Sequence, residues 1–260
     1  MKYIGIFDSG IGGLTVAQKL MKRLPHEAIA YLGDTARCPY GEKEKETIIQ
    51  YSLENVSFLN QHLLKILIVA CGTASACAID ILRQRCSFPV VGVIEPTIAS
   101  AVAATKNQRI AILATTRTIA SEAYQIGLQQ QLPQAILYPL ACPQFAPLLE
   151  QRCVEYKIVK DIVKETLSPL KGTNIDVVIL GCTHYPLLAD IIQEELGPNV
   201  SLIDLSHTCA QAAEAELLAN DLLSPSTTNP QHHYYATNDP DKFQHLSQHF
   251  FGTRVHVRNA

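Results

Sequence analysis

Two cysteines in this chain of 260 residues follow apolar runs typical of buried strands: Cys71 ends ILIVAC and Cys182 ends VVILGC. Two thiols at matching strand ends suit exchange of the α-hydrogen of an amino acid, because inversion needs a base on one face and an acid on the other. A thiol can play either part, since nearby cations or helix-start amides lower its pKa from about 8.5. We therefore predict that they form a proton-transfer pair; the alternative is two inert, buried thiols.

Two further polar residues follow predicted strands. His184 is placed to hold the Cys182 thiol ionised or to orient a substrate, whereas the alternative is a core imidazole with satisfied hydrogen bonds. Asp8 suits contact with a substrate ammonium or tuning of a cysteine, and it could instead cap a helix starting near Gly12.

A third group of residues suits a carboxylate. The turn Pro39-Tyr40-Gly41 precedes a predicted helix and offers free backbone amides, and the hydroxyls of Ser9, Thr73 and Thr183 are further donors. A ligand that bears a carboxylate is thus expected, unless Tyr40 and Gly41 belong to a plain surface turn.

Short apolar runs alternate with longer amphipathic segments, which predicts an α/β fold with parallel strands covered on both faces. In such sheets ligands bind beyond the carboxyl ends of the strands. Helices are expected within Glu46–Leu63 and Glu155–Thr166. Strands are expected at Ile4–Phe7, Ile29–Leu32, Ile66–Ala70, Val90–Val93, Ile110–Leu113, Ile136–Pro139, Val177–Leu180 and Ser201–Ile203.

The spacing of these strands repeats. Strand starts at 4, 29, 66 and 90 are followed at similar intervals by starts at 110, 136, 177 and 201. Chance periodicity is the alternative, but the paired cysteines favour two copies of one unit. We predict two pseudo-symmetric α/β domains with mainly parallel sheets, residues 1–95 plus 207–260 and residues 96–206.

The last part of the chain departs from this repeat. After Ser206 it predicts an Ala-rich helix, a polar loop at Ser224–Gln231 and a hairpin-like unit that packs back onto one half. Within that unit Asp239 caps a helix that Gly252 ends, and three apolar residues share a face, namely Phe243, Leu246 and Phe250.

Other motifs are weaker. Gly10–Gly13 lacks the spacing of a dinucleotide fingerprint or a P-loop. His245 and His249 lie four residues apart without the Glu of a metalloprotease helix, so we expect a solvated face and no metal. His232 and His233 are expected to be exposed in the polar loop.

Composition excludes several partners. The net charge is −3 and the basic residues are scattered, which argues against nucleic acid and membrane surfaces. Asp8 interrupts the N-terminal apolar run, so no signal peptide is expected and a cytoplasmic location follows by default. The eight cysteines should then be reduced. The sequence leaves open whether the chain forms a homodimer.

Longer motifs extend these observations over nearly the whole chain: FDSGIGGLT at Phe7–Thr15, GDTARCPYG at Gly33–Gly41, GVIEP at Gly92–Pro96, ACPQFAPLLE at Ala141–Glu150 and GCTHYPLL at Gly181–Leu188. As a set they resemble glutamate racemases of the aspartate/glutamate racemase superfamily. The resemblance implies a cofactor-free, two-base reaction, with the two cysteines on opposite faces of glutamate in a cleft between two domains.

The resemblance also implies the residues around the substrate and the role of the product. Expected site residues are Asp8, Ser9, Tyr40, Gly41, Gly72, Thr73, Thr183 and His184, with Glu150, Thr115 and Thr118 close by. The product would be D-glutamate for peptidoglycan, in a bacterial cell-wall enzyme.

One departure from the family pattern concerns the residue after the first cysteine. Family members usually have Asn there, whereas this chain has Gly72, and Cys38 adds a thiol where a small residue is commoner. Without the Asn amide, polar atoms of the substrate must find their hydrogen bonds with water or with the backbone. A buried polar group that finds no partner costs about 1–3 kcal/mol of free energy. Two alternatives therefore stay open: the substrate is aspartate or another amino acid, or the chain is a ligand-binding homologue with little turnover. A pyridoxal-phosphate racemase is disfavoured, because no lysine stands out at a strand end.

Overall fold

A computed structural model describes residues 2–150, 155–225, 228–252 and 254–260, without the side chains of 249–251. The strands are β1 (Tyr3–Asp8), β2 (Ala28–Gly33), β3 (Leu64–Val69), β4 (Val90–Gly92), β5 (Arg109–Ala114), β6 (Ile136–Ala141), β7 (Val177–Leu180), β8 (Ser201–Asp204), β9 (His233–Ala236) and β10 (Val257–Asn259). The α-helices are α1 (Leu14–Arg23), α2 (Lys45–Leu59), α3 (Gly72–Arg85), α4 (Ile94–Ala104), α5 (Thr116–Ala120), α6 (Ala123–Gln131), α7 (Phe145–Glu150), α8 (Tyr156–Leu167), α9 (Ala189–Leu196), α10 (Leu205–Ala219) and α11 (Pro240–Phe251), with 3-10 turns η1 (Ser168–Leu170) and η2 (Tyr185–Leu188).

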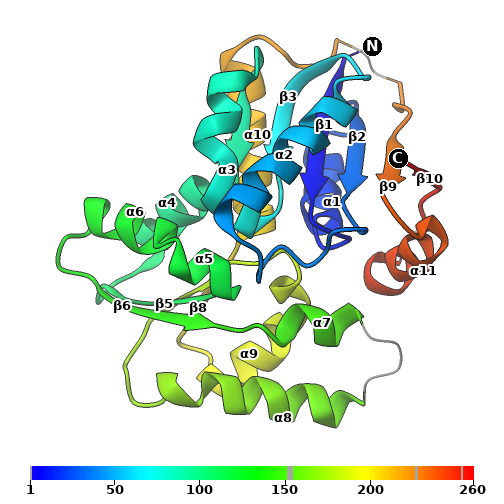
Figure 1. Ribbon diagram of the computed structural model, residues 1–260. Coiled ribbons are helices and arrows are strands. Elements are labelled where there is room, and N and C mark those ends of the chain that lie inside the picture. Colours follow the sequence, from blue (N-terminus) through cyan, green and yellow to red (C-terminus); the bar gives the residue numbers. More distant parts are fainter. Residues whose placement is uncertain (1, 151–154, 226–227, 253) are drawn as a thin grey trace.

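The strands form two parallel sheets, which confirms the predicted α/β class (Figure 1). The first sheet has the order β10-β9-β2-β1-β3-β4 and the second has the order β6-β5-β7-β8. The shared part of the first sheet, β2-β1-β3-β4, repeats in the second with every strand advanced by four. All eight predicted strands are present, and the repeat in strand spacing corresponds to this repeated topology. The residue boundaries assigned to the two domains stay a prediction.

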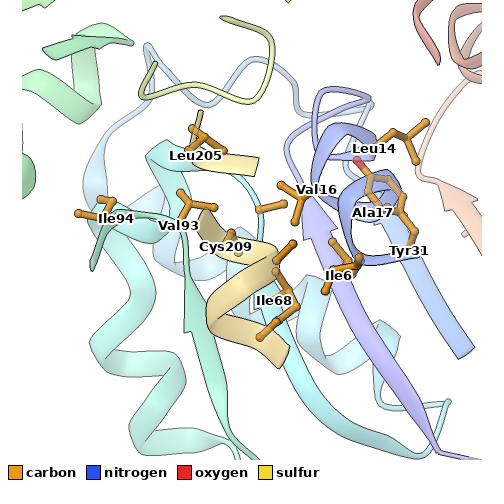
Figure 2. Close-up of a cluster of buried hydrophobic side chains, with 14 of the residues drawn as sticks. Ile6, Leu14, Val16, Ala17, Tyr31, Ile68, Val93, Ile94, Leu205 and Cys209 are labelled. Atoms are coloured by element: carbon orange, nitrogen blue, oxygen red, sulfur yellow. The ribbon is translucent and has the colours of Figure 1, made fainter. Parts of the chain in front are cut away.

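Side chains of the first sheet alternate between two buried faces, as parallel strands require. Ile4 and Ile6 of β1 pack toward α1 and α10, whereas Phe7 packs toward α2 and α3. Figure 2 shows the first of these layers, where Ile6 and Ile68 from neighbouring strands face Val16 of α1 and Cys209 of α10. Both faces are therefore covered by helices, and the chemistry is left to the strand ends.

One hydrophobic core joins the two sheets. The cluster that contains Ile6 continues through Ile98 of α4 to Ile112 and Ile179 on one face of the second sheet. Helices α7, α8 and α9 cover the other face of that sheet, where Leu180 is buried among their apolar side chains. The relative position of the two sheets is thus set by packed side chains as well as by the connecting chain.

The C-terminal part corrects two expectations. Instead of a hairpin, β9, α11 and β10 form a parallel strand–helix–strand unit that extends the first sheet beyond β2. His233 is not exposed in a loop but lies half-buried in β9, where its Nε2 is 3.2 Å from the Tyr3 hydroxyl. Asp239 caps α11 by accepting a 3.0 Å hydrogen bond from the Lys242 amide, as predicted.

Further expectations concern the end of α11, its apolar face and the length of the helices. Gly252 ends α11 with a φ of +66°, and Phe243 and Leu246 are buried, whereas the side chains of Phe250 and His249 lie outside the described residues. No helix in the described part of the chain combines the length and the apolar character needed to cross a bilayer.

A buried ion pair at the start of β3 provides a test of the packing beneath the site. Lys65 pairs with Glu27, both side chains are 4% exposed, and the Lys65 ammonium also donates to the Leu222 carbonyl at 2.6 Å. Lys65→Met should lower the free energy of unfolding by about 3–5 kcal/mol, because Glu27 is left buried without its partner. Urea denaturation measures this loss.

The matched control is Arg83→Met, which removes an exposed ion pair with Glu95 and should cost less than about 1 kcal/mol. Equal losses in the two variants would show that the buried pair adds nothing beyond a surface pair.

Candidate active site

A cavity of about 220 Å³ lies where the carboxyl ends of the two sheets meet. This volume suits a molecule of amino-acid size rather than a larger ligand. Its lining residues come from the segments after β1, β2 and β3 of the first sheet, from those after β5, β6 and β7 of the second, and from α11. They are Ser9, Thr35, Cys38, Pro39, Tyr40, Gly41, Cys71, Gly72, Thr73, Thr115, Ala146, Pro147, Glu150, Gly181, Cys182, Thr183, His184 and Lys242.

All the predicted site residues line this cavity except Asp8 and Thr118. Asp8 is fully buried behind the wall and approaches Thr183, whose hydroxyl lies 3.4 Å from Asp8 Oδ1. It is not the N-cap of the helix, because α1 begins at Leu14 with Gly13 before it; instead Asp8 Oδ2 accepts a 2.9 Å hydrogen bond from the Gly10 amide. Burial raises the pKa of Asp8, against the charge of His184 and the amide hydrogen bonds.

Cys71 lies between the end of β3 and the first residue of α3. Its sulfur accepts a hydrogen bond from the Ala74 amide at 3.4 Å and so caps α3, and it lies 3.7 Å from Ser9 Oγ. Burial and the neighbouring Asp8 nevertheless raise the pKa of Cys71 to about 12. This thiol is therefore protonated at neutral pH.

The environment of Cys182 differs from that of Cys71. Its sulfur is 3.8 Å from His184 Nδ1, and His184 Nε2 is 2.8 Å from Glu150 Oε1. Burial lowers the pKa of His184, but hydrogen bonds and charge from Cys182 and Glu150 outweigh this and raise it to about 10. The Cys182 sulfur therefore lies beside an imidazolium that a carboxylate holds in place.

Glu150 completes this arrangement from α7. Burial raises its pKa, yet the hydrogen bond and charge of His184 are stronger and the pKa of Glu150 is lowered. The two partners therefore agree: the pair is held as imidazolium and carboxylate.

Hydroxyl groups link the two halves of the wall. Thr73 Oγ1 of α3 is 2.9 Å from Thr115 Oγ1, which is 2.9 Å from Thr118 Oγ1 of α5. Gly41 adds a backbone link, since its carbonyl accepts from the Arg117 amide at 2.9 Å. The hydroxyls of Thr73, Thr115 and Thr183 line the cavity and fit a carboxylate-bearing ligand as donors.

Tyr40 plays a structural part in this wall. Its ring is 1% exposed, its hydroxyl donates to Asp34, and Asn55 Nδ2 donates to that hydroxyl at 3.1 Å. The turn around Tyr40 is thus anchored in the first half rather than free at the surface.

Sequence reasoning missed several lining residues. Lys242 brings a positive charge from α11, and Thr35, Ala146 and Pro147 complete the wall. Lys242 had no sequence signal, because its place depends on the unpredicted pairing of β9 with β2. Cys38, singled out as an extra thiol, lines the cavity, and burial and Glu150 raise its pKa.

Within the described ranges, no group of three or more His, Cys, Asp or Glu side chains is arranged to hold a metal ion. The cavity is lined by the thiols of Cys71, Cys182 and Cys38, the charged His184–Glu150 pair, the Lys242 ammonium and the hydroxyl wall. Together they define a two-lobed α/β protein with acid and base groups on a small-molecule site.

Comparison with known proteins narrows this class. Residues 14–213 match the family described as Asp/Glu/hydantoin racemase, and the chain belongs to that family. It is 42% identical to a glutamate racemase of Geobacter metallireducens over 98% of this chain and 94% of that protein.

Solved structures agree. A glutamate racemase isoform from Bacillus anthracis superposes with a TM-score of 0.97 at 37% identity, covering 100% of this chain and 97% of that one. A glutamate racemase from Francisella tularensis in complex with D-glutamate gives 0.92 at 36% identity, covering 100% and 97%.

The charge of His184 can be tested by titration. NMR of the imidazole nitrogens should show His184 protonated at neutral pH with a midpoint near the pKa of about 10, and Glu150→Gln should lower that midpoint. The pKa of His184 in the folded protein lies above the usual ~6.5 of a free imidazole. Protonation of His184 therefore stabilises the fold fully below pH ~6.5, and this contribution is lost as the pH rises through the folded-state pKa of about 10. Glu194→Gln, which removes an exposed partner of Lys160, is the control.

A wild-type midpoint near the usual value, or one that Glu150→Gln leaves in place, would contradict the pairing.

Proposed function

We propose that this protein interconverts L-glutamate and D-glutamate by a two-base reaction of Cys71 and Cys182, without a cofactor. The observation that carries the proposal is the placement of both thiols in one cavity, each at the end of the equivalent strand of its sheet, β3 and β7. The family and the glutamate racemases that this chain resembles over nearly its full length support glutamate as the substrate.

In the proposed step from one enantiomer, the Cys182 thiolate takes the α-proton and becomes a thiol. The electron pair of the broken C–H bond stays on the α-carbon. The Cys71 thiol then gives its proton to the opposite face and becomes a thiolate, so a new C–H bond forms and the configuration inverts. The reverse reaction exchanges these roles. Proton exchange with solvent, which takes a proton from Cys182 and returns one to Cys71, restores the starting thiolate and thiol.

The surroundings of the thiols fit these roles. In this direction Cys71 is the proton donor, since its raised pKa keeps it protonated at neutral pH, and the His184 imidazolium that Glu150 holds lies beside the Cys182 sulfur. We propose that the hydroxyls of Thr73, Thr115 and Thr183 and the backbone of Gly41 hold the substrate carboxylates. Asp8, behind the wall, acts through Thr183 rather than by contact with substrate.

Several wider statements belong to the same proposal. D-glutamate would supply peptidoglycan synthesis, the enzyme would work in the cytoplasm, and residues 1–95 plus 207–260 and 96–206 would form the two domains. The sheets support this division, since β1–β4, β9 and β10 lie in one and β5–β8 in the other. Homodimer formation stays an open alternative.

The two-thiol proposal predicts a specific loss of activity. Cys71→Ala and Cys182→Ala should each lower racemisation of L-glutamate by at least about 10²-fold, a typical contribution of one acid–base group. Circular dichroism of the substrate follows the reaction. Cys77→Ala, which removes a buried thiol of α3 that does not line the cavity, should retain activity.

If either cavity variant racemises as fast as wild type, that thiol is not one of the two bases. Activity that depends on added pyridoxal phosphate, or a Schiff-base absorbance band, would reject the cofactor-free reaction.

The alternatives to a glutamate racemase are an enzyme for another amino acid and a binding protein with little turnover. They stay open because Gly72 stands where the family usually has Asn. The rates of wild type with glutamate, aspartate and other amino acids should show a preference for glutamate. Faster turnover of aspartate would reject glutamate as the substrate. Calorimetric binding of D-glutamate without α-proton exchange would indicate a binding protein.

A further inference from the structure

Gly72 and Gly181 both line the cavity and touch each other next to the two cysteines. Gly72 is the first residue of α3 and follows Cys71, while Gly181 lies between the last residue of β7 and Cys182. A Cβ atom added to Gly72 would fall closer than 3.0 Å to the Gly181 carbonyl oxygen, a separation that real Cβ atoms essentially never show. The lack of a side chain at Gly72 therefore allows the two cysteine-bearing segments to approach this closely.

Gly181 has little room to retreat from such a side chain. Its amide donates to the Leu113 carbonyl at 2.7 Å. Its own Cα faces that carbonyl, Ala114 and the ring of Tyr124, with a Cβ at Gly181 falling 2.8–3.1 Å from them. Tyr124 is fully buried. A side chain at Gly72 must therefore push apart the ends of β3 and β7, which carry the thiols.

Two other glycines near the site would meet side chains instead of backbone. A Cβ at Gly12 would meet the side-chain ends of Thr183 and His184, and one at Gly41 would meet the Cβ of Thr115. Of these three glycines, only Gly72 would meet a backbone carbonyl, that of Gly181, whose amide is held by the Leu113 carbonyl.

We propose that Gly72 is a positioning residue that sets the spacing between Cys71 and Cys182. This inference rests on the proposed two-thiol reaction. It also bears on the Asn that the family usually has at this position. An Asn side chain begins with a Cβ, and the contact between Gly72 and the Gly181 carbonyl leaves no space for that atom. Gly72 replaces an amide contact to the substrate with a closer approach of the two thiol-bearing segments.

The spacing matters because inversion needs both thiols within reach of one carbon atom, whereas exchange on a single face needs only one. Misplacement by about 1 Å can lower a rate by about 10²-fold. A wider gap should therefore impair inversion more than it impairs exchange.

The test compares Gly72→Ala with wild type in deuterium oxide, starting from L-glutamate. Chiral chromatography with mass spectrometry measures deuterium in the recovered L-glutamate and in the D-glutamate formed. We expect Gly72→Ala to lower inversion by about 10²-fold and to raise the ratio of labelled L-glutamate to labelled D-glutamate. The control is Gly127→Ala in α6, where a Cβ would meet only the side chain of Ile98, and it should resemble wild type.

Inversion by Gly72→Ala at the wild-type rate would overturn the proposal. So would a parallel loss of inversion and exchange, which indicates general damage rather than altered spacing. If wild type itself neither exchanges nor inverts glutamate, the proposed function fails instead.

A second measurement does not depend on the variant folding. In a crystal structure of the wild-type protein with D-glutamate, a Cβ built on Gly72 should still fall within 3.0 Å of the Gly181 oxygen. A liganded site with room for that Cβ would overturn the positioning role.

Discussion

The meeting of the ends of β3 and β7 is the constraint on which the site depends. Both strands occupy the same position in their sheets, each ends in a cysteine-bearing segment, and the backbones there touch at Gly72 and Gly181. A shared hydrophobic core fixes the relation of the two sheets, so this contact does not rely on surface loops alone. Repeated topology thus turns two similar strand ends into opposite walls of one cavity.

The two walls are alike in backbone but different in charge. Cys71 is buried beside Asp8, which favours its thiol, while Cys182 lies beside an imidazolium that Glu150 holds in place. The two halves therefore place different groups beside their thiols, a carboxyl group next to Cys71 and an imidazolium next to Cys182.

The sequence predicted what depends on local pattern. The eight strands of the repeat were predictable because buried parallel strands are short apolar runs, and Cys71 and Cys182 followed from the equivalent ends of two such runs. By contrast, β9 and β10 were not predicted, and the structure reveals them through the pairing of β9 with β2 and of β10 with β9. Lys242 and the position of His233 depend on that pairing.

Other features depend on distances that no pattern encodes. The sequence shows Gly72 as a missing amide, but not that the Gly181 carbonyl occupies the space of its side chain. Likewise Asp8 lies at the carboxyl end of β1 as expected, yet only the packing places it behind Thr183 rather than in the cavity.

The most direct test of the account is isotope labelling of the wild-type reaction at early times. In deuterium oxide, two thiols on opposite faces predict that deuterium enters mainly the newly formed enantiomer, whether L-glutamate or D-glutamate is the starting material. Equal early labelling of the recovered substrate and the product would show a single base that reaches both faces, and would contradict the two-thiol site.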